Sequence, residues 1–190
     1  MGEARELSAP DSALGARFTR LLDLHQAALH SFAFSMVSDR ELAHDIVQEA
    51  FVAAWRIASH HEAPFSDPCD DEGVRRWLFA VTYRQAALVL RKRRHVVWQS
   101  LDVVKPDNIA PASPDIAIGV VEADALRSAL STLTPVDAAC FLLQAVHGFS
   151  TREIADVVQL RPDVVRKRLS RSRQRLRDAY IAQSSHVPNA

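Results

Sequence analysis

The sequence predicts an all-α protein made of two small helical domains, joined by a flexible, acidic and proline-containing linker. Apolar residues recur at helical spacing in both halves, and Gly accounts for only 5 of the 190 residues. Between the halves, residues 98–121 contain three prolines, three acids and a single Lys, so this stretch cannot continue as a helix. We therefore expect one domain over 14–97 and a second, containing a helix-turn-helix, over 122–182.

The first half predicts three helices. One covers about 14–36, and a second follows with Ser38 or Asp39 as its N-terminal cap. Residues 59–73 hold two prolines, a glycine and five acids without apolar periodicity, which predicts a loop, and a third helix is expected over about 74–94. The residues expected to face the core are Phe18, Leu21, Leu22, Leu29, Phe32, Met36, Leu42, Ile46, Val47, Ala50, Phe51, Ala53, Trp55, Ile57, Trp77, Val81 and Leu88.

The second half predicts short helices over about 122–131, 135–148 and 150–159, followed by a basic helix from Pro162 onward. The last two fit a helix-turn-helix, in which Ser150 or Thr151 caps the first helix and Glu153 complements its dipole. Residues 159–161 make the turn, and Pro162 occupies the first turn of the next helix, where a missing N–H costs least. The core stripe of that helix is Val165, Leu169, Ser172 and Leu176.

Charge is unevenly distributed in a chain whose formal net charge is zero. Residues 161–177 hold eight of the 23 basic side chains and one acid, residues 84–94 hold five basic groups and no acid, and residues 39–49 hold four acids and one Arg. Blocks of opposite sign indicate different partners for different faces. Because acids that would form i,i+4 pairs are nearly absent from 161–177, we interpret this helix as DNA-binding rather than as a solvated basic face.

The orientation of the core stripe divides the outward side chains of this helix into two groups. Those of the first two turns would enter a major groove, and those further along would meet phosphates. The first group is Asp163, Arg166, Lys167 and Ser170, and the second is Arg171, Arg173, Arg175 and Arg177.

Three motifs together resemble the extracytoplasmic-function (ECF) sigma factors of bacterial RNA polymerase, a group of the sigma-70 family. They are DRELAHDIVQEAFVAAWR (39–56), RRWLFAVTYRQAALVLRKRR (75–94) and LTPVDAACFLLQAVHGFSTREIADVVQLRPDVVRKRLSRSRQRLR (133–177). The resemblance covers about residues 15–182. It implies a protein that binds core RNA polymerase, through its β′ and β subunits, and directs transcription initiation at promoters through their −10 and −35 elements.

The resemblance also implies roles for particular residues. Asp45, Gln48 and Glu49 match the polymerase-binding D-x-x-Q-E core, and the helix-turn-helix matches the reader of the −35 element. The loop 59–73 corresponds to the segment that holds a flipped −10 base, and the linker to one that threads through the polymerase. The −10 contacts are expected from Phe79 and Tyr83, as exposed stacking platforms, and from Arg84, Arg91, Lys92, Arg93 and Arg94 on the DNA backbone.

One departure concerns the turn of the helix-turn-helix. Gln159 stands where the family often has Gly, at a cost of about 1 kcal/mol if the backbone there is left-handed. An anti-sigma factor is a further partner that the resemblance implies.

Other functions are less well supported. A stand-alone helix-turn-helix regulator would use the same basic helix without polymerase. An enzyme or metal site would have to use His60, His61, Cys69 and Asp70, but these lack regular ligand spacing and no catalytic set can be assembled. We expect no enzymatic activity, cofactor or metal, and Cys140 as a core residue. No apolar stretch approaches a membrane span, which predicts a cytoplasmic protein without membrane insertion.

Overall fold

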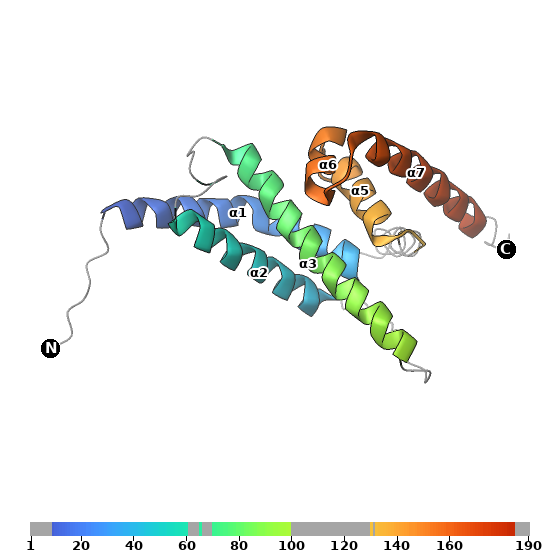
Figure 1. Cartoon of the computed structure of the whole chain (residues 1–190), viewed down its shortest axis with the longest axis horizontal. Coiled ribbons are helices and arrows are strands. Elements are labelled where there is room, and N and C mark those ends of the chain that lie inside the picture. The colour runs from blue at the N-terminus through green and yellow to red at the C-terminus, as the bar shows by residue number, and fades with distance from the viewer. Residues whose placement is uncertain (1–8, 61–64, 66–69, 100–129, 131, 185–190) are drawn as a thin grey trace. The chain divides into compact units, whose positions relative to one another are not determined.

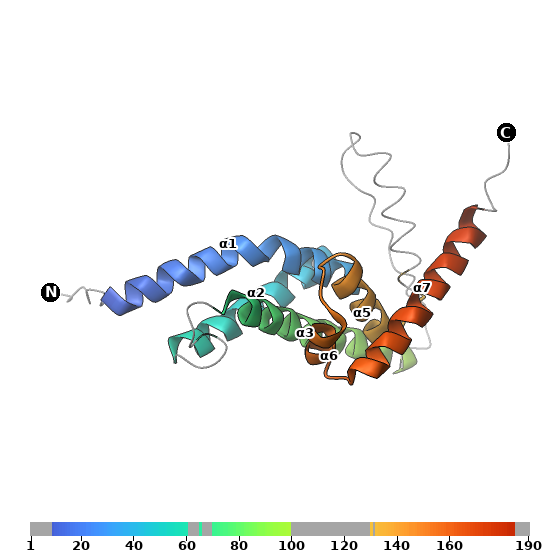
Figure 2. The ribbon, with the colours of Figure 1, turned by 90° about the horizontal axis from the view of Figure 1, so that it is seen from above.

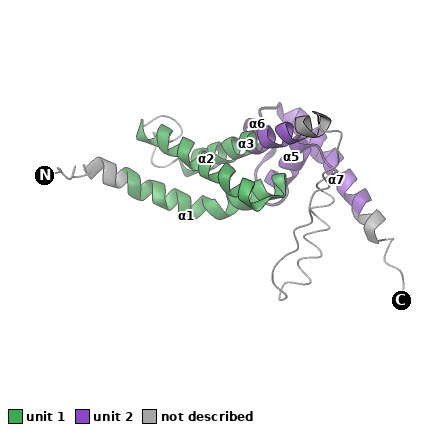
Figure 3. Ribbon diagram, turned by 90° about the horizontal axis from the view of Figure 1, so that it is seen from below, with its two compact units in different colours: residues 1–85 green, residues 86–190 purple. Residues whose placement is uncertain are grey.

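The computed structural model describes residues 9–60, 65, 70–99, 130 and 132–184, and this part of the chain is helical and contains no strand (Figure 1). The prediction of an all-α protein is confirmed. Two compact units, residues 1–85 and 86–190, divide the chain (Figure 3). Beyond Gln99, the predicted linker 98–121 lies outside the described residues, as does most of the helix predicted over 122–131.

Helices α1 (Ala9–Val37) and α2 (Arg40–Ser59) pack against each other in the first unit (Figures 1 and 2). The turn between them is tight because Ser38 adopts a left-handed conformation, with φ of 55°. Its backbone N–H donates to the Phe34 carbonyl at 2.8 Å. Asp39 is the cap, since its Oδ1 accepts from the Leu42 backbone N–H at 3.1 Å.

Helix α3 (Asp71–Gln99) begins at a side-chain cap as well, because Asp70 Oδ1 accepts from the Gly73 backbone N–H at 2.7 Å. A Cβ added at Gly73 would collide with the Asp70 carboxylate, so a larger residue there would have to displace the capping side chain. Within the preceding loop, Phe65 is buried and meets Trp77 edge-to-face, with ring centroids 5.6 Å apart. Arg17 of α1 donates to the Phe65 carbonyl at 3.0 Å, which anchors this point of the loop to the first helix.

The core of the first unit follows the predicted helical stripes in part. Trp55 of α2 was expected to face inward but is 42% exposed, and so was Leu88 of α3, which falls in the second unit and is 36% exposed. Ala43, Ala54 and Ala58 are buried instead, because these small side chains let α1 approach α2 closely. The buried apolar residues of α1 and α2 are Leu21, Leu29, Phe32, Ala33, Met36, Val37, Ala43, Ile46, Val47, Ala50, Phe51, Ala54 and Ala58.

In the second unit, helices α5 (Pro135–Ala145), α6 (Thr151–Val158) and α7 (Pro162–Ser184) pack against one another (Figure 2). All three match predicted helices to within a few residues. Gly148, with φ of 71°, reverses the chain after α5 so that Phe149 is buried and its N–H donates to the Leu143 carbonyl. Among the described residues, the model holds no helix with the length and apolar character to cross a bilayer.

His25 is a buried histidine of α1 whose Nε2 lacks a hydrogen-bond partner within the described residues. Burial, and then the charge of Arg75, lower its pKa below the ordinary value, although Asp71 and Glu72 oppose the shift. The unfolded chain therefore binds a proton more readily than the folded chain does. The stability contribution is complete above the unfolded pKa and is lost as pH falls toward the folded pKa.

We expect the free energy of unfolding to decline between about pH 7 and pH 5, and His25→Leu to reduce that decline because it removes the proton-binding site. Denaturant titrations at several pH values, followed by tryptophan fluorescence, measure both. His60→Gln, at an exposed histidine, is the matched control for the loss of one histidine. An unchanged decline in His25→Leu would contradict the assignment.

Candidate nucleic-acid interface and docking face

The three candidate docking residues, Asp45, Gln48 and Glu49, are all exposed on α2. Their positions repeat at three and four residues, so they share the face opposite the buried stripe of that helix. The Gln48 side-chain nitrogen lies 2.6 Å from Nε2 of His44, which accepts only when that ring nitrogen carries no proton. His44 in turn stacks on His30 of α1, with ring centroids 5.2 Å apart. Gln48 is therefore oriented by a pair of histidines between the two helices.

The exposed face of α2 continues beyond the predicted set. Val52 and Trp55 lie one and two turns further along and are 45% and 42% exposed. The Trp55 ring rests edge-to-face against Phe18 of α1, with centroids 5.0 Å apart, while its other side is accessible. Seven residues separate Gln48 from Trp55, which places both on one face of a helix, and this spacing could have predicted the exposure of Trp55. Trp55 was expected in the core because it lies in an apolar run.

The candidate −10 residues of α3 divide into buried and exposed groups. Phe79 was predicted to be an exposed stacking platform, and this was wrong: it is 1% exposed. Its ring packs on Phe32 of α1, with centroids 5.4 Å apart, and Arg75 covers it from 5.8 Å. Phe79 is therefore a core residue and cannot stack on a base in this arrangement.

The other −10 candidates are more accessible. Tyr83 is half-buried, so part of its ring is available, and Arg84 is exposed beside it. Further along α3, three more cationic side chains, Arg91, Lys92 and Arg93, are exposed, while the side chain of Arg94 lies outside the described residues. The exposed part of the predicted set thus consists mainly of cations that suit a phosphate backbone.

The helix-turn-helix forms as the sequence indicated. Ser150 and Glu153 make a reciprocal capping box at the start of α6: the Glu153 N–H donates to the Ser150 hydroxyl at 3.3 Å, and the Ser150 N–H donates to the Glu153 carboxylate at 2.8 Å. Gln159 ends α6 in the left-handed conformation, with φ of 57° and ψ of 47°. Its side-chain amide donates to the Asp156 carbonyl at 2.7 Å, which partly offsets that conformation.

The predicted DNA-reading residues of α7 are mostly exposed, on the side of the helix away from its core stripe. Val165, Leu169 and Ser172 are buried as the core stripe, whereas Leu176 is only half-buried. Asp163 is half-exposed and contacts Arg161 at 3.3 Å. Arg173 is exposed but donates to Gln144 of α5, so its guanidinium is already held at one edge of the helix. The exposed members of the predicted set are Arg166, Lys167, Ser170, Arg171, Arg173, Arg175 and Arg177.

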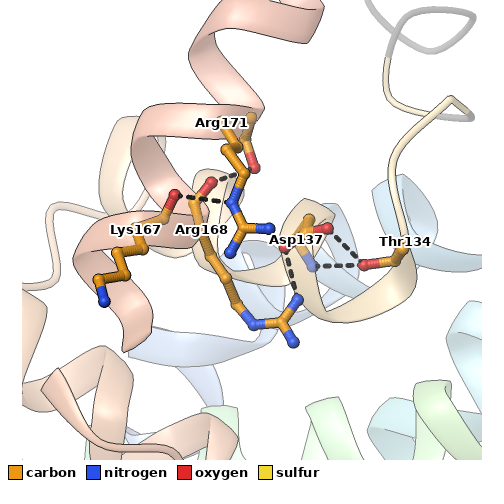
Figure 4. Close-up of polar contacts among 6 residues, drawn as sticks. Thr134, Asp137, Lys167, Arg168 and Arg171 are labelled. Atoms are coloured by element: carbon orange, nitrogen blue, oxygen red, sulfur yellow. Dashed lines mark hydrogen bonds and ion pairs between the residues drawn. The ribbon is translucent and has the colours of Figure 1, made fainter. Parts of the chain in front are cut away.

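Arg168 belongs to the same basic run but does not point outward with the others. Its Nη1 donates to Asp137 of α5 at 2.8 Å, and the Thr134 hydroxyl donates to the second carboxylate oxygen of Asp137 at 2.6 Å (Figure 4). Burial of Asp137 disfavours its charged form, but the hydrogen bonds from Thr134 and Arg168 and the charges of Arg168 and Arg175 outweigh it. They hold the pKa of Asp137 below the ordinary value. The resulting stability is present above the unfolded pKa and is lost as pH falls through the folded one.

Of the four residues considered for a metal or enzyme site, the structure describes His60 and Asp70. His60 follows the last residue of α2 and Asp70 caps α3, so both have structural positions, while His61 and Cys69 lie outside the described residues. Within the described ranges, no group of three or more His, Cys, Asp or Glu side chains is placed to hold a metal ion. Cys140 is fully buried, and burial raises the pKa of its thiol to about 11, so it is not poised as a nucleophile.

Two family models match the chain: sigma-70 region 2 over residues 21–96 and sigma-70 region 4 over residues 123–176. Together they cover more than half of the sequence and contain the docking face and the helix-turn-helix. The chain belongs to the sigma-70 family. The names of its relatives place this sigma factor in the ECF group.

Three relatives illustrate the similarity. "Probable ECF RNA polymerase sigma factor SigI" of Mycobacterium tuberculosis is 30% identical over 172 residues, which cover 84% of this chain and 54% of the relative. "Probable RNA polymerase sigma factor RfaY" of Xanthomonas campestris is 28% identical, covering 90% and 43%. "RNA polymerase sigma factor CarQ" of Myxococcus xanthus is 28% identical, covering 85% and 87%. The sigma factor described here thus spans about half the length of the first two.

Two solved structures share the fold of this chain. The sigma factor RpoE in complex with the anti-sigma factor NepR, from Bartonella quintana, is 26% identical with a TM-score of 0.66 and covers 86% of this chain and 96% of that one. CnrH in complex with the cytosolic domain of CnrY is 27% identical with a TM-score of 0.62 and covers 87% and 88%.

The left-handed turn of this sigma factor gives a stability test. Gln159→Gly should raise the free energy of unfolding by about 0.5–1 kcal/mol, because glycine adopts positive φ without a steric penalty. Gln159→Ala should lower it, because it retains the penalty and loses the hydrogen bond to Asp156. Denaturant unfolding of the full chain measures both changes. Equal stability of the Gly and Ala variants would show that the turn is not strained.

Proposed function

We propose that this chain is a promoter-specific initiation factor that binds core RNA polymerase through residues 14–97 and reads −35 DNA through residues 122–182. The observation that carries the proposal is that one chain presents both an exposed acidic helix face, at Asp45 and Glu49, and an exposed basic recognition helix. A stand-alone helix-turn-helix regulator accounts for the second face but not for the first. The proposed activity creates no covalent bond, and we place it in the cytoplasm with the polymerase.

The docking contact follows from the chemistry of the α2 face. Two carboxylates one turn apart attract basic side chains of a partner helix and fix its register. Gln48, oriented by His44, adds a directional hydrogen-bonding group, and the exposed Trp55 ring adds the kind of apolar anchor that dominates many interfaces. We propose that the β′ subunit of the polymerase supplies the complementary surface and that the β subunit contacts the second domain.

On the DNA side, we propose that Tyr83 and the exposed cations of α3 bind the −10 element and stabilise its melted strand. Unstacking of bases costs a few kcal/mol per base unless a protein surface binds the unstacked base. The revised set lacks Phe79, so Tyr83 is the aromatic platform on the described part of this surface. The loop 59–73 would receive a flipped base. In the second domain, Arg166 and Lys167 would read base edges.

An anti-sigma factor is a proposed partner as well. Both solved relatives were determined in complex with another chain, NepR in one case and the cytosolic domain of CnrY in the other. We propose that a protein of this kind restrains the present chain by covering surfaces that polymerase needs.

Docking and DNA recognition should be separable. We expect Asp45→Lys with Glu49→Lys to abolish retention of core polymerase in a pull-down at physiological salt, because two attractions become repulsions. The control is Asp23→Lys with Asp178→Lys, which changes net charge equally at exposed acids outside the α2 face. Retention of core polymerase by the first double variant, at the level of the control, would refute the docking assignment.

The recognition helix should contain readers and anchors. In holoenzyme assembled with the full chain, Arg166→Ala should change which −35 base pairs are tolerated, with a loss of about 1–3 kcal/mol at the preferred pair. Arg177→Ala should weaken all sequences alike and flatten the salt dependence by roughly one unit of slope, because one fewer phosphate is neutralised. Binding to single-base −35 variants at several salt concentrations measures both. A uniform loss in Arg166→Ala would contradict base reading.

A further inference from the structure

Arg168 differs from its basic neighbours on α7 in exposure. Among the basic side chains that the structure describes on this helix, Arg168 alone is half-buried, with 29% of its side chain accessible. Its Nε is buried and has no hydrogen-bond partner within the described residues. The guanidinium reaches across to α5, whereas the adjacent Lys167 side chain points away from that contact (Figure 4). The Arg168 side chain therefore bonds to Asp137, a residue of the same unit.

That partner, Asp137, is held by contacts on both carboxylate oxygens. Arg168 donates to one and Thr134 donates to the other, while the Asp137 backbone N–H returns a hydrogen bond to the Thr134 hydroxyl at 3.3 Å. Thr134 is the N-terminal cap of α5, so the carboxylate is fixed relative to that helix end. The ion pair thus joins a fixed point on α5 to a residue 31 positions away on α7.

The ion pair restricts the rotation of α7 about its own axis, which apolar packing restricts only weakly. The stripe of α7 that faces the unit is narrow and contains the small Ser172, whose hydroxyl donates to the Arg168 carbonyl within the same helix at 2.9 Å. Apolar contacts are not directional, so they oppose rotation of a helix about its axis less than a hydrogen-bonded ion pair does. Rotation at Arg168 would turn Arg166 and Lys167 equally, since all three belong to one rigid helix.

We propose that Arg168 is a positioning residue that does not contact DNA. Its ion pair with Asp137 sets the rotation of α7 about its axis, and so sets the direction in which Arg166 and Lys167 point. This inference rests on the proposed −35 recognition. If Arg168 were instead a phosphate ligand, it would have to leave Asp137, and a side chain that is only 12% exposed would lose its counter-charge. Removing one partner of a buried pair is strongly unfavourable.

The two roles predict opposite effects for Asp137→Asn. A phosphate-binding Arg168 would be released by this change, and one negative charge would disappear, so DNA affinity should rise for every sequence. A positioning Arg168 would lose its anchor, so discrimination among −35 sequences should fall. Asp137 is buried on α5 and contacts Thr134 and Arg168, so its substitution acts on DNA through these residues.

The experiment uses the full chain assembled with core polymerase and duplex promoter probes, either matched or carrying single-base −35 changes, over a series of salt concentrations. The variants are Asp137→Asn, Arg168→Met and the double variant, with Arg171→Met as the control one turn further along the exposed face. We expect each single variant to reduce the matched-to-mismatched ratio several-fold, the double variant to be no worse than either, and the salt slope to be unchanged. Arg171→Met should lower the slope by roughly 0.9.

Circular dichroism at the binding temperature checks that each variant is folded. A second control is the charge-reversed pair, Asp137→Arg with Arg168→Asp, which should restore part of the matched-to-mismatched binding ratio. A salt slope that falls in Arg168→Met as it does in Arg171→Met would overturn the proposal. So would lower melting temperatures with unchanged sequence ratios, because the pair would then only stabilise the unit. The unaltered chain is measured first: if it shows no −35 preference, the proposed function fails, and this inference with it.

Discussion

Asp137 is a largely buried residue of α5, which packs against α6 and α7, and a charge in that position must be neutralised by groups that reach it with good geometry. Thr134 and Arg168 meet this requirement from α5 and α7. Apolar packing among these helices supplies cohesion but little direction, whereas the charge-assisted hydrogen bond from Arg168 to Asp137, whose carboxylate is fixed by Thr134, defines one arrangement of α5 and α7. The contact between Arg168 and Asp137 therefore sets the orientation of the exposed side chains of α7.

The zero net charge of the chain conceals two surfaces that are built for opposite partners. The exposed face of α2 carries Asp45 and Glu49, and that of α7 carries mainly arginine and lysine. Beyond about 8–10 Å, exposed charges at physiological salt are largely screened, so each surface attracts its partner through its local charge. Net charge is therefore a poor guide to the partners of this chain, and the sign of each segment is a good one.

Two of the described turns between helices rely on a residue other than glycine in the left-handed conformation, Ser38 before α2 and Gln159 before α7. Hydrogen bonds offset the strain at each: the Ser38 N–H bonds to the Phe34 carbonyl, and the Gln159 amide bonds to the Asp156 carbonyl. The second of these turns joins α6 to α7, and its strain was expected because the ECF sigma factors that the sequence resembles often have Gly at the position of Gln159.

The sequence alone determined the described helices, the cap candidates for α2 and α6, the helix-turn-helix and the exposure of Asp45, Gln48, Glu49 and most of the basic side chains of α7. These depend on periodicity and on hydrogen bonds between residues close along the chain. Only the tertiary structure decided that Phe79 is buried, that Trp55 is partly exposed and that Arg168 turns inward to Asp137. These residues lie at the margin of an apolar stripe, where helical periodicity does not determine whether a side chain is buried or exposed. A neighbour distant in sequence settles it: Phe32 for Phe79, Phe18 for Trp55 and Asp137 for Arg168.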